Sequence, residues 1–244
     1  MKWGIVSVTF RSMSPKEIIL LAAKAGAECI EWGGDVHVPD EGAARYVGEL
    51  TRENGLVSAA YGSYYRAGEG MDIDPVLKTA SALGTGAVRI WAGKRYSREG
   101  EYVNKVRDDI ALCVKRAREY DLDISLECHR GTLTENRSTA LYLAENTGCL
   151  LHFQPNPDIA YEENLLCIKD TAKHIKHVHV FAWEKGKQGD VRLPLEEHTD
   201  IWRGYMEGIP EGAYCMIEFV KNDTAEQFLK DGEVLKKLCG KVKI

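Results

Sequence analysis

The chain has 244 residues and a formal net charge of −5, and 44% of its residues are hydrophobic and 28% are charged. This length suits one large domain or two small ones, and the acidic balance argues against a general surface for nucleic acid or anionic membranes. No apolar run is long enough to span a bilayer. Because no Pro/Gly/Ser-rich linker divides the chain, we expect one domain over residues 1–244.

The cysteines indicate a reducing environment. The seven are scattered singly, and none forms a CxxC pair. We find no signal peptide, so we expect a cytoplasmic protein whose cysteines pack as small apolar groups.

Short apolar or alternating runs, each followed by a helix-type pattern, recur along the whole chain. The expected strands are residues 2–10, 27–33, 56–64, 87–93, 123–129, 149–155, 177–183 and 213–220. Helical patterns lie between them, for example over residues 14–27, 41–54, 98–120 and 224–239. In the first helix Ser14 can cap the N-terminus, Pro15 suits the first turn and Glu17 completes a capping box.

The strand starts advance by about 30 residues, and eight such units fill the chain. This repeat favours a closed (β/α)8 TIM barrel. The alternative is an open, doubly wound sheet, which usually carries a Gly-rich phosphate loop after a strand; the sequence contains no such loop.

Polar residues gather where the expected strands end, which in a barrel is the end that carries the chemistry. Four consecutive strands end in Glu127, Gln154, His179 and Glu218. Buried polar groups at this density are costly unless they are paired or bind a metal. Oxygen and imidazole ligands suit a divalent ion such as Mn²⁺, Co²⁺, Mg²⁺ or Zn²⁺. Two carboxylates beside such an ion could move a proton next to a carbonyl group.

Several segments together resemble the xylose isomerase-like TIM barrel superfamily, in particular its sugar phosphate isomerase/epimerase branch. They are "IEWGGDVHVP", "YGSYYRAG", "VRIWAGK", "LECH", "HVHV" and "MIEF", in the family's order over nearly the whole chain. The resemblance is specific for the superfamily and uninformative about the substrate. It implies a fold, a divalent metal and a sugar or sugar-derivative substrate, and the family's habit makes dimers or tetramers plausible.

The resemblance also implies a metal-ligand set of a Glu, an Asp, a His and a Glu from strands five to eight. These fall on Glu127, Gln154, His179 and Glu218, so this chain has Gln in place of the family's Asp. A Gln oxygen can still bind a metal ion, although the loss of a charge should weaken binding. Alternatively, metal binding is lost and Gln154 contacts a substrate hydroxyl. His152 is either a substitute ligand or, as we expect, a buried and hydrogen-bonded core residue.

Other residues are predicted to contact the substrate. His129 resembles the family's substrate-contacting residue beyond the first Glu, and Arg192 matches a place where the family contacts an anionic or hydroxyl group. Arg89 either pairs with Glu31 inside the barrel or reaches the substrate. The remaining candidates are His37 and Trp32, which follow the second strand and could cover the apolar face of a sugar, and Tyr64, in a glycine-flanked segment that could form a lid.

We therefore expect a metal-dependent sugar or sugar phosphate isomerase or epimerase, with Glu127 and Glu218 as the catalytic residues. A dehydratase or lyase on the same barrel is the first alternative, and a metal-free sugar-binding barrel is the second. An endonuclease of the same superfamily would need a larger His/Asp/Glu set for three metals, and an acidic surface disfavours DNA.

Overall fold

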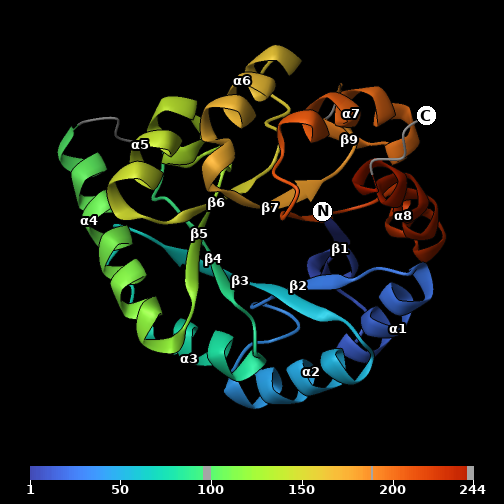
Figure 1. Cartoon of the computed structure of the whole chain (residues 1–244), viewed down its shortest axis with the longest axis horizontal. Helices are drawn as coiled ribbons and strands as arrows, with labels where there is room; N and C mark the ends of the chain where they lie inside the picture. Colours follow the sequence, from blue (N-terminus) through green and yellow to red (C-terminus); the bar gives the residue numbers. More distant parts are fainter. Residues whose placement is uncertain (96–99, 188, 241–244) are drawn as a thin grey trace.

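Eight parallel strands form a closed barrel in the computed structural model, which describes residues 1–95, 100–187 and 189–240. The barrel order is β1-β10-β7-β6-β5-β4-β3-β2, and Figure 1 shows the helices arranged around the outside of the strands. The barrel strands are β1 (Lys2–Val6), β2 (Cys29–Gly33), β3 (Val57–Arg66), β4 (Ala87–Trp91), β5 (Asp123–Glu127), β6 (Leu150–Phe153), β7 (Ile175–Val180) and β10 (Tyr214–Ile217).

Within the described residues, one α-helix follows each barrel strand before the next barrel strand begins. The α-helices are α1 (Pro15–Ala25), α2 (Glu41–Glu53), α3 (Asp74–Leu83), α4 (Gly100–Ala117), α5 (Arg137–Thr147), α6 (Tyr161–Thr171), α7 (Thr199–Gly208) and α8 (Ala225–Cys239). Short 3-10 turns are η1 (Ser7–Phe10), η2 (Arg118–Tyr120), η3 (Leu133–Glu135), η4 (Ala172–His174), η5 (Leu195–His198) and η6 (Lys221–Asp223). No described helix is long and apolar enough to cross a membrane.

The predicted (β/α)8 barrel is confirmed, and the alternative of an open, doubly wound sheet is wrong. Each of the eight predicted strands overlaps one barrel strand, although β3 runs two residues past the predicted 56–64 and β7 begins two residues before the predicted 177–183. The first is shorter than predicted because its second half, Ser7–Phe10, turns into a 3-10 helix. There the Ser7 hydroxyl accepts a hydrogen bond from the backbone of Gly33, at 2.8 Å. Residues 98–99 of the helix predicted over 98–120 lie outside the described residues.

The first helix begins as its sequence predicts. The Ser14 hydroxyl accepts from the backbone N–H of Glu17 at 3.3 Å, and the Glu17 carboxylate accepts from the backbone N–H of Ser14 at 2.7 Å. Pro15 occupies the first turn, and Gly26 ends the helix with φ 73°. The capping box is therefore present as predicted.

Two apolar clusters of different size stabilise the barrel. The large apolar core includes the buried sides of helices such as α1, where Ile18 and Ile19 are fully buried. A second, small apolar cluster holds Val6, Val8, Cys29, Ala59 and Met216. Beyond this small cluster, polar side chains approach one another from several barrel strands, and these side chains make the candidate site.

A two-stranded antiparallel hairpin follows β7 and was missed by the sequence analysis. Its strands are β8 (Trp183–Gly186) and β9 (Gly189–Arg192). The predicted strand 177–183 therefore contains the end of β7 and the first residue of the hairpin. The hairpin carries Arg192, one of the predicted substrate contacts.

Candidate active site

The four predicted metal ligands meet around the imidazole of His179. Glu127 ends β5, Gln154 follows β6, His179 lies in β7 and Glu218 follows β10. His179 Nδ1 lies 3.2 Å from Gln154 Oε1, 3.4 Å from Glu218 Oε2 and 3.8 Å from Glu127 Oε1. Parallel barrel strands point their carboxyl ends the same way, which is why residues far apart in sequence meet here. We call these four side chains the outer set.

The distances from His179 Nδ1 to the three outer-set oxygens resemble those between ligands of one divalent ion, but among the described residues the only three His, Cys, Asp or Glu ligand atoms that all lie within 4.8 Å of one another belong to Glu31, His152 and His179. Zinc lies about 2.0–2.2 Å from nitrogen and oxygen ligands, so two donors on one ion lie roughly 3–3.5 Å apart. The separations of the three oxygens from His179 Nδ1 are close to that range. Carboxylate, amide and imidazole donors together suit Mn²⁺, Co²⁺, Mg²⁺ or Zn²⁺. Metal binding by these residues stays a prediction that the geometry supports.

The Glu127 carboxylate is held by two donors from β4. Its Oε2 accepts hydrogen bonds from Arg89 Nη1 and from the indole Nε1 of Trp91. Burial opposes ionisation of Glu127, but the positive charges of Arg89 and His179 outweigh burial, and the pKa of Glu127 is lowered. Glu127 is therefore a fixed carboxylate anion, and its Oε1 faces His179.

Arg89 is a buried bridge between two carboxylates. Its Nε donates to Glu31 Oε1 at 2.8 Å, and its Nη1 donates to Glu127. Only 4% of the residue is exposed. The ion pair with Glu31, which the sequence left as one of two alternatives, is thus present. A contact between Arg89 and a substrate stays a prediction.

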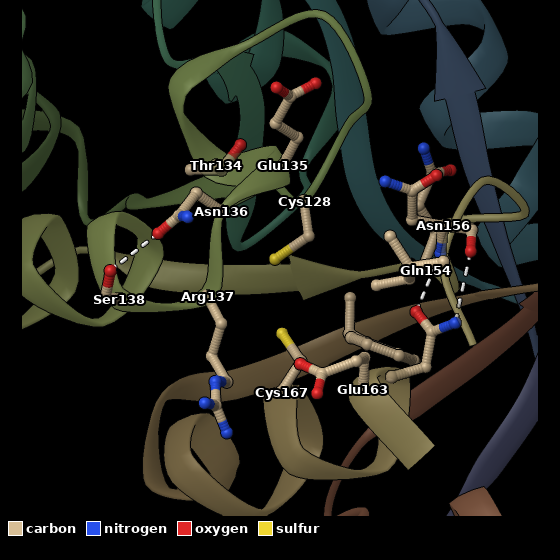
Figure 2. Close-up of a pocket in the computed structure, with 13 residues that line it drawn as sticks. Cys128, Thr134, Glu135, Asn136, Arg137, Ser138, Gln154, Asn156, Glu163 and Cys167 are labelled. Carbon is tan, nitrogen blue, oxygen red and sulfur yellow. Dashed lines mark hydrogen bonds between the residues drawn. The ribbon is translucent and has the colours of Figure 1, made fainter. Parts of the chain in front are cut away.

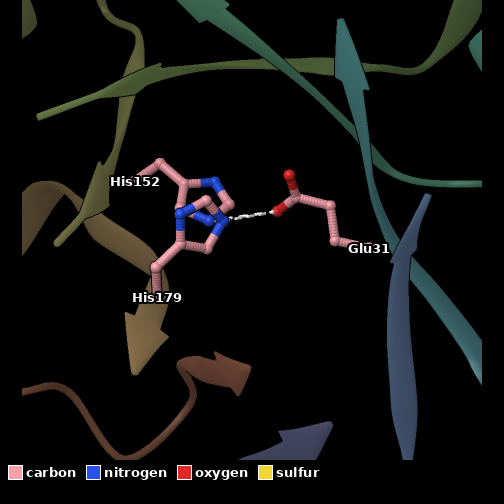
Figure 3. A group of neighbouring side chains, drawn as sticks. All are labelled: Glu31, His152 and His179. Atoms are coloured by element: carbon pink, nitrogen blue, oxygen red, sulfur yellow. Dashed lines mark hydrogen bonds and ion pairs between the residues drawn. The ribbon is translucent and has the colours of Figure 1, made fainter. Parts of the chain in front are cut away.

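The second ring nitrogen of His179 faces the barrel interior. Nε2 lies 3.1 Å from Glu31 Oε2, and Figure 3 shows the imidazole and the carboxylate directed at each other. Burial lowers the pKa of His179, but Glu218 and Glu31 outweigh burial and raise it to about 10. Burial also opposes ionisation of Glu31, yet His152, Arg89 and His179 hold the pKa of Glu31 well below its usual value.

His152 lies beside this contact and differs from its prediction in one respect. It is fully buried, as expected, but neither ring nitrogen makes a hydrogen bond to another described residue. Its Nε2 lies 3.1 Å from Glu31 Oε2 without hydrogen-bond geometry. The prediction of a hydrogen-bonded core residue was therefore wrong. Ligand atoms of Glu31, His152 and His179 all lie within 4.8 Å of one another, and we call these three side chains the inner set.

Predicted substrate contacts gather around Trp91, which is not among the predicted site residues. The ring centroid of Trp91 lies 5.4 Å from that of Tyr64 and 5.4 Å from that of His129. Tyr64 is 41% exposed. Because Trp91 also holds Glu127, these aromatic groups border the outer set. Residues two apart on a strand lie on the same side, so the position of Trp91 two residues after Arg89 could have identified it as a site residue.

Two other predicted substrate contacts are not brought to the outer set. Trp32 follows Glu31 on β2, so it points to the opposite side of the strand and is fully buried in the large core. His37 is also buried, with Nδ1 3.0 Å from the Ser7 hydroxyl and Nε2 3.2 Å from the carbonyl oxygen of Met13. Both ring nitrogens of His37 are thus already engaged.

Arg192 lies at the rim of the site on the β8–β9 hairpin. Its Nη1 pairs with Asp223, and its guanidinium carbon is 4.3 Å from the centroid of the Phe219 ring. Phe219 in turn packs near Trp183, with ring centroids 5.9 Å apart. The hairpin and the loop after β10 therefore form one aromatic rim, which the sequence analysis missed together with the hairpin.

A cavity of about 90 Å³ opens at the outer set. Its lining includes Glu127, His129, Gln154, Trp183, Glu218 and Phe219. A larger cavity of about 260 Å³ lies beside it, against the start of α5 and against α6, and Figure 2 shows its polar lining. The two cavities share Cys128, Gln154 and Asn156. We place the candidate active site at the smaller cavity because it is lined by Glu127 and Glu218, the two carboxylates that face His179 Nδ1.

Known structures share this fold at low sequence identity. The probable 3-DHS dehydratase AsbF of Bacillus anthracis has a TM-score of 0.77 and 17% identity over 97% of this chain and 99% of that chain. The 3-keto-D-glucoside 4-epimerase YcjR of E. coli has a TM-score of 0.71 and 14% identity over 98% and 100%. A xylose isomerase-like TIM barrel protein of Mycobacterium smegmatis, in complex with magnesium, has a TM-score of 0.68 and 11% identity over 98% and 97%.

No curated protein matches the sequence. The pattern of one protein family does match it, over residues 19–238. The match covers most of the chain and agrees with the closed barrel and with the similar solved structures. The chain therefore belongs to the xylose isomerase-like TIM barrel family.

Proposed function

We propose that the protein is a metal-dependent isomerase or epimerase of a small sugar, sugar phosphate or other sugar derivative. The observation that carries this proposal is the meeting of Glu127, Gln154 and Glu218 around Nδ1 of His179. A divalent ion bound there supplies positive charge that polarises a carbonyl oxygen and makes the neighbouring C–H more acidic. Membership in a family whose solved relatives include an epimerase agrees with the proposal.

The two carboxylates are suited to different tasks. Glu127 is fixed in position by two donors from β4 that bind its Oε2, which leaves Oε1 directed toward His179. Glu218 is 8% exposed and lines the cavity. Among the described residues, its one ion pair is with His179. Glu218 is therefore the better placed base to take a proton from the substrate carbon.

The fate of that proton defines the reaction. If Glu218 returns the proton to the adjacent carbon, an aldose and a ketose interconvert. If Glu127 instead delivers a proton that it has taken up from solvent to the opposite face of the same carbon, the product is an epimer. His129 and Tyr64, which contact Trp91 at the border of the outer set, would hold the substrate in place.

The test is a panel of aldoses, ketoses and their phosphates in D₂O with Mn²⁺ or Co²⁺, followed by NMR. We expect deuterium at the reacting carbon and a large loss of turnover in Glu218→Gln and Glu127→Gln. Glu184→Gln is the matched control, because Glu184 lies on β8 and its side chain is 64% exposed. Substantial turnover in both active-site variants, or turnover without exchange at carbon, would contradict the mechanism.

A dehydratase is the second candidate, because removal of a proton by the Glu218 carboxylate also begins the loss of water. A similar fold in a probable dehydratase agrees with this alternative. Water loss, seen as a new C=C signal in the same NMR experiment, separates the two reactions. A metal-free sugar-binding barrel would instead bind sugars without turnover and without any response to added ions.

A further inference from the structure

The proposed function leaves the inner set, Glu31, His152 and His179, without a complete explanation. His152 is fully buried, and neither of its ring nitrogens has a hydrogen-bond partner among the described residues. A buried polar group without a hydrogen-bond partner destabilises the folded state. The ring of His177 stacks on it with centroids 5.0 Å apart, and the ring of His179 lies tilted beside it with centroids 4.2 Å apart.

The arrangement around Glu31 matches the ligand geometry of a cation. Glu31 Oε2 lies 3.1 Å from His152 Nε2 and 3.1 Å from His179 Nε2, and Figure 3 shows both rings on one side of the carboxylate. Donors on one divalent ion lie roughly 3–3.5 Å apart. Two imidazoles and one carboxylate form a set that suits Zn²⁺ and other ions that prefer nitrogen ligands.

Arg89 limits this set but does not block it. Arg89 binds Glu31 through Oε1 at 2.8 Å, so Oε2 is left to face the two imidazoles. Its positive charge opposes a nearby cation, but Arg89 is already paired with the carboxylates of both Glu31 and Glu127. An ion at Oε2 would give His152 Nε2 the partner that it lacks.

We propose that Glu31, His152 and His179 form an inner binding site for a nitrogen-preferring divalent ion such as Zn²⁺. The inner site would use His179 Nε2, whereas the outer set would use His179 Nδ1. A neutral imidazole has only one nitrogen free to bind a metal, so the two sites compete for His179. This competition, but not the inner site itself, rests on the proposed function.

Gln154 can stabilise the form of His179 that binds an inner ion. When Nε2 of His179 binds an inner ion, Nδ1 carries the proton and can donate it to Gln154 Oε1, which is 3.2 Å away. The outer set is rich in oxygen and suits Mn²⁺ or Mg²⁺, whereas the inner set is rich in nitrogen. We therefore expect Zn²⁺ to lower the apparent affinity for Mn²⁺.

The experiment measures binding of Zn²⁺ and of Mn²⁺ to the full chain by calorimetry, for the wild type, His152→Phe and Glu218→Gln. His152→Phe keeps a stacking ring and removes only inner-site donors. We expect it to weaken Zn²⁺ binding at least about tenfold and to leave Mn²⁺ binding unchanged. Glu218→Gln, an outer-set variant, should weaken Mn²⁺ binding and leave Zn²⁺ binding largely unchanged.

X-ray absorption of the zinc-loaded wild type gives a second answer that needs no variant. Two imidazole ligands support the inner site, and one imidazole ligand overturns it. Unchanged Zn²⁺ affinity in His152→Phe, or equal losses for both ions, also overturns it. If His152→Phe does not fold, His152→Gln takes its place and the absorption result decides. A failure of the proposed function looks different: Mn²⁺ binding is absent while the two-imidazole zinc signal persists.

Discussion

Gln154 is the residue at which this chain departs from the ligand set that its family resemblance implies. Its Oε1 already lies 3.2 Å from His179 Nδ1, and Asp, which is one methylene shorter than Gln, is the residue that the resemblance implies here and would add a negative charge. We predict that Gln154→Asp tightens Mn²⁺ binding about tenfold or more, measured by calorimetry, because each added carboxylate raises the attraction for a divalent ion.

Asn156→Asp is the matched control for this substitution. Asn156 also lines the cavity, but its backbone is held by Asn164, at 2.8 Å, away from the contacts of His179. It adds the same charge to the cavity without adding a ligand. Equal gains in both variants would show a general electrostatic effect, and no gain in Gln154→Asp would remove Gln154 from the ligand set.

Arg89 holds two buried carboxylates, and its removal should therefore be costly. Breaking a buried ion pair by removing one partner costs about 3–5 kcal/mol, because it leaves buried charge without compensation. We predict a loss of that order in the free energy of unfolding for Arg89→Met, measured by urea denaturation. The control is Arg45→Met: Arg45 pairs with Glu41 on the surface, with 70% of its side chain exposed, and should change stability by less than about 1 kcal/mol.

At the scale of elements, the repeat of strand and helix was predictable because its signals are local. Alternating apolar residues, the Ser14 cap and the Gly26 stop can each be recognised within a few residues. The β8–β9 hairpin was not predicted, because its strands have four residues each and an exposed, charged surface. A short, polar hairpin lacks the apolar pattern that marks a barrel strand.

The contact between α2 and α3 depends on a glycine. A Cβ atom added to Gly48 would lie 2.2 Å from the carbonyl oxygen of Leu83, near the end of α3. Alanine is the better helix former by about 1 kcal/mol, but this backbone overlap forces the helices apart. We predict that Gly48→Ala lowers the free energy of unfolding by about 1–3 kcal/mol, measured by denaturation.

Gly100→Ala is the control, because Gly100 begins α4 and an added Cβ would meet nothing within 4 Å. We expect Gly100→Ala to leave stability unchanged or to raise it by up to about 1 kcal/mol. A stabilising effect of Gly48→Ala would show that α2 and α3 adjust without cost.

At the scale of the whole molecule, the outer set was predictable because barrel topology brings the ends of consecutive strands together. Once the strands were predicted, their carboxyl ends identified Glu127, Gln154, His179 and Glu218. The inner contacts were harder: the sequence suggested Glu31 beside Arg89, but not that Arg89 would also bind Glu127. Side-chain reach across the barrel interior decides such contacts. Cytoplasmic location and association into dimers or tetramers stay predictions.

Metal binding should also stabilise the whole barrel, because the outer set joins β5, β7 and the segments that follow β6 and β10. An ion that binds only the folded state, at a concentration about 100 times its Kd, adds about 2.7 kcal/mol. For a domain of this size, each kcal/mol raises Tm by about 2–4 °C. We therefore predict that saturating Mn²⁺ raises Tm by about 5–10 °C and that EDTA reverses the shift.

The variants separate this effect from nonspecific stabilisation. Glu218→Gln removes an outer-set carboxylate and should lose most of the shift, whereas Glu184→Gln, on the exposed hairpin, should keep it. Because the ion would bind at the carboxyl ends of the strands, hydrogen exchange should slow most at those ends of β5, β7 and β10. Equal shifts in all three proteins, or protection confined to the opposite end of the barrel, would place the ion elsewhere.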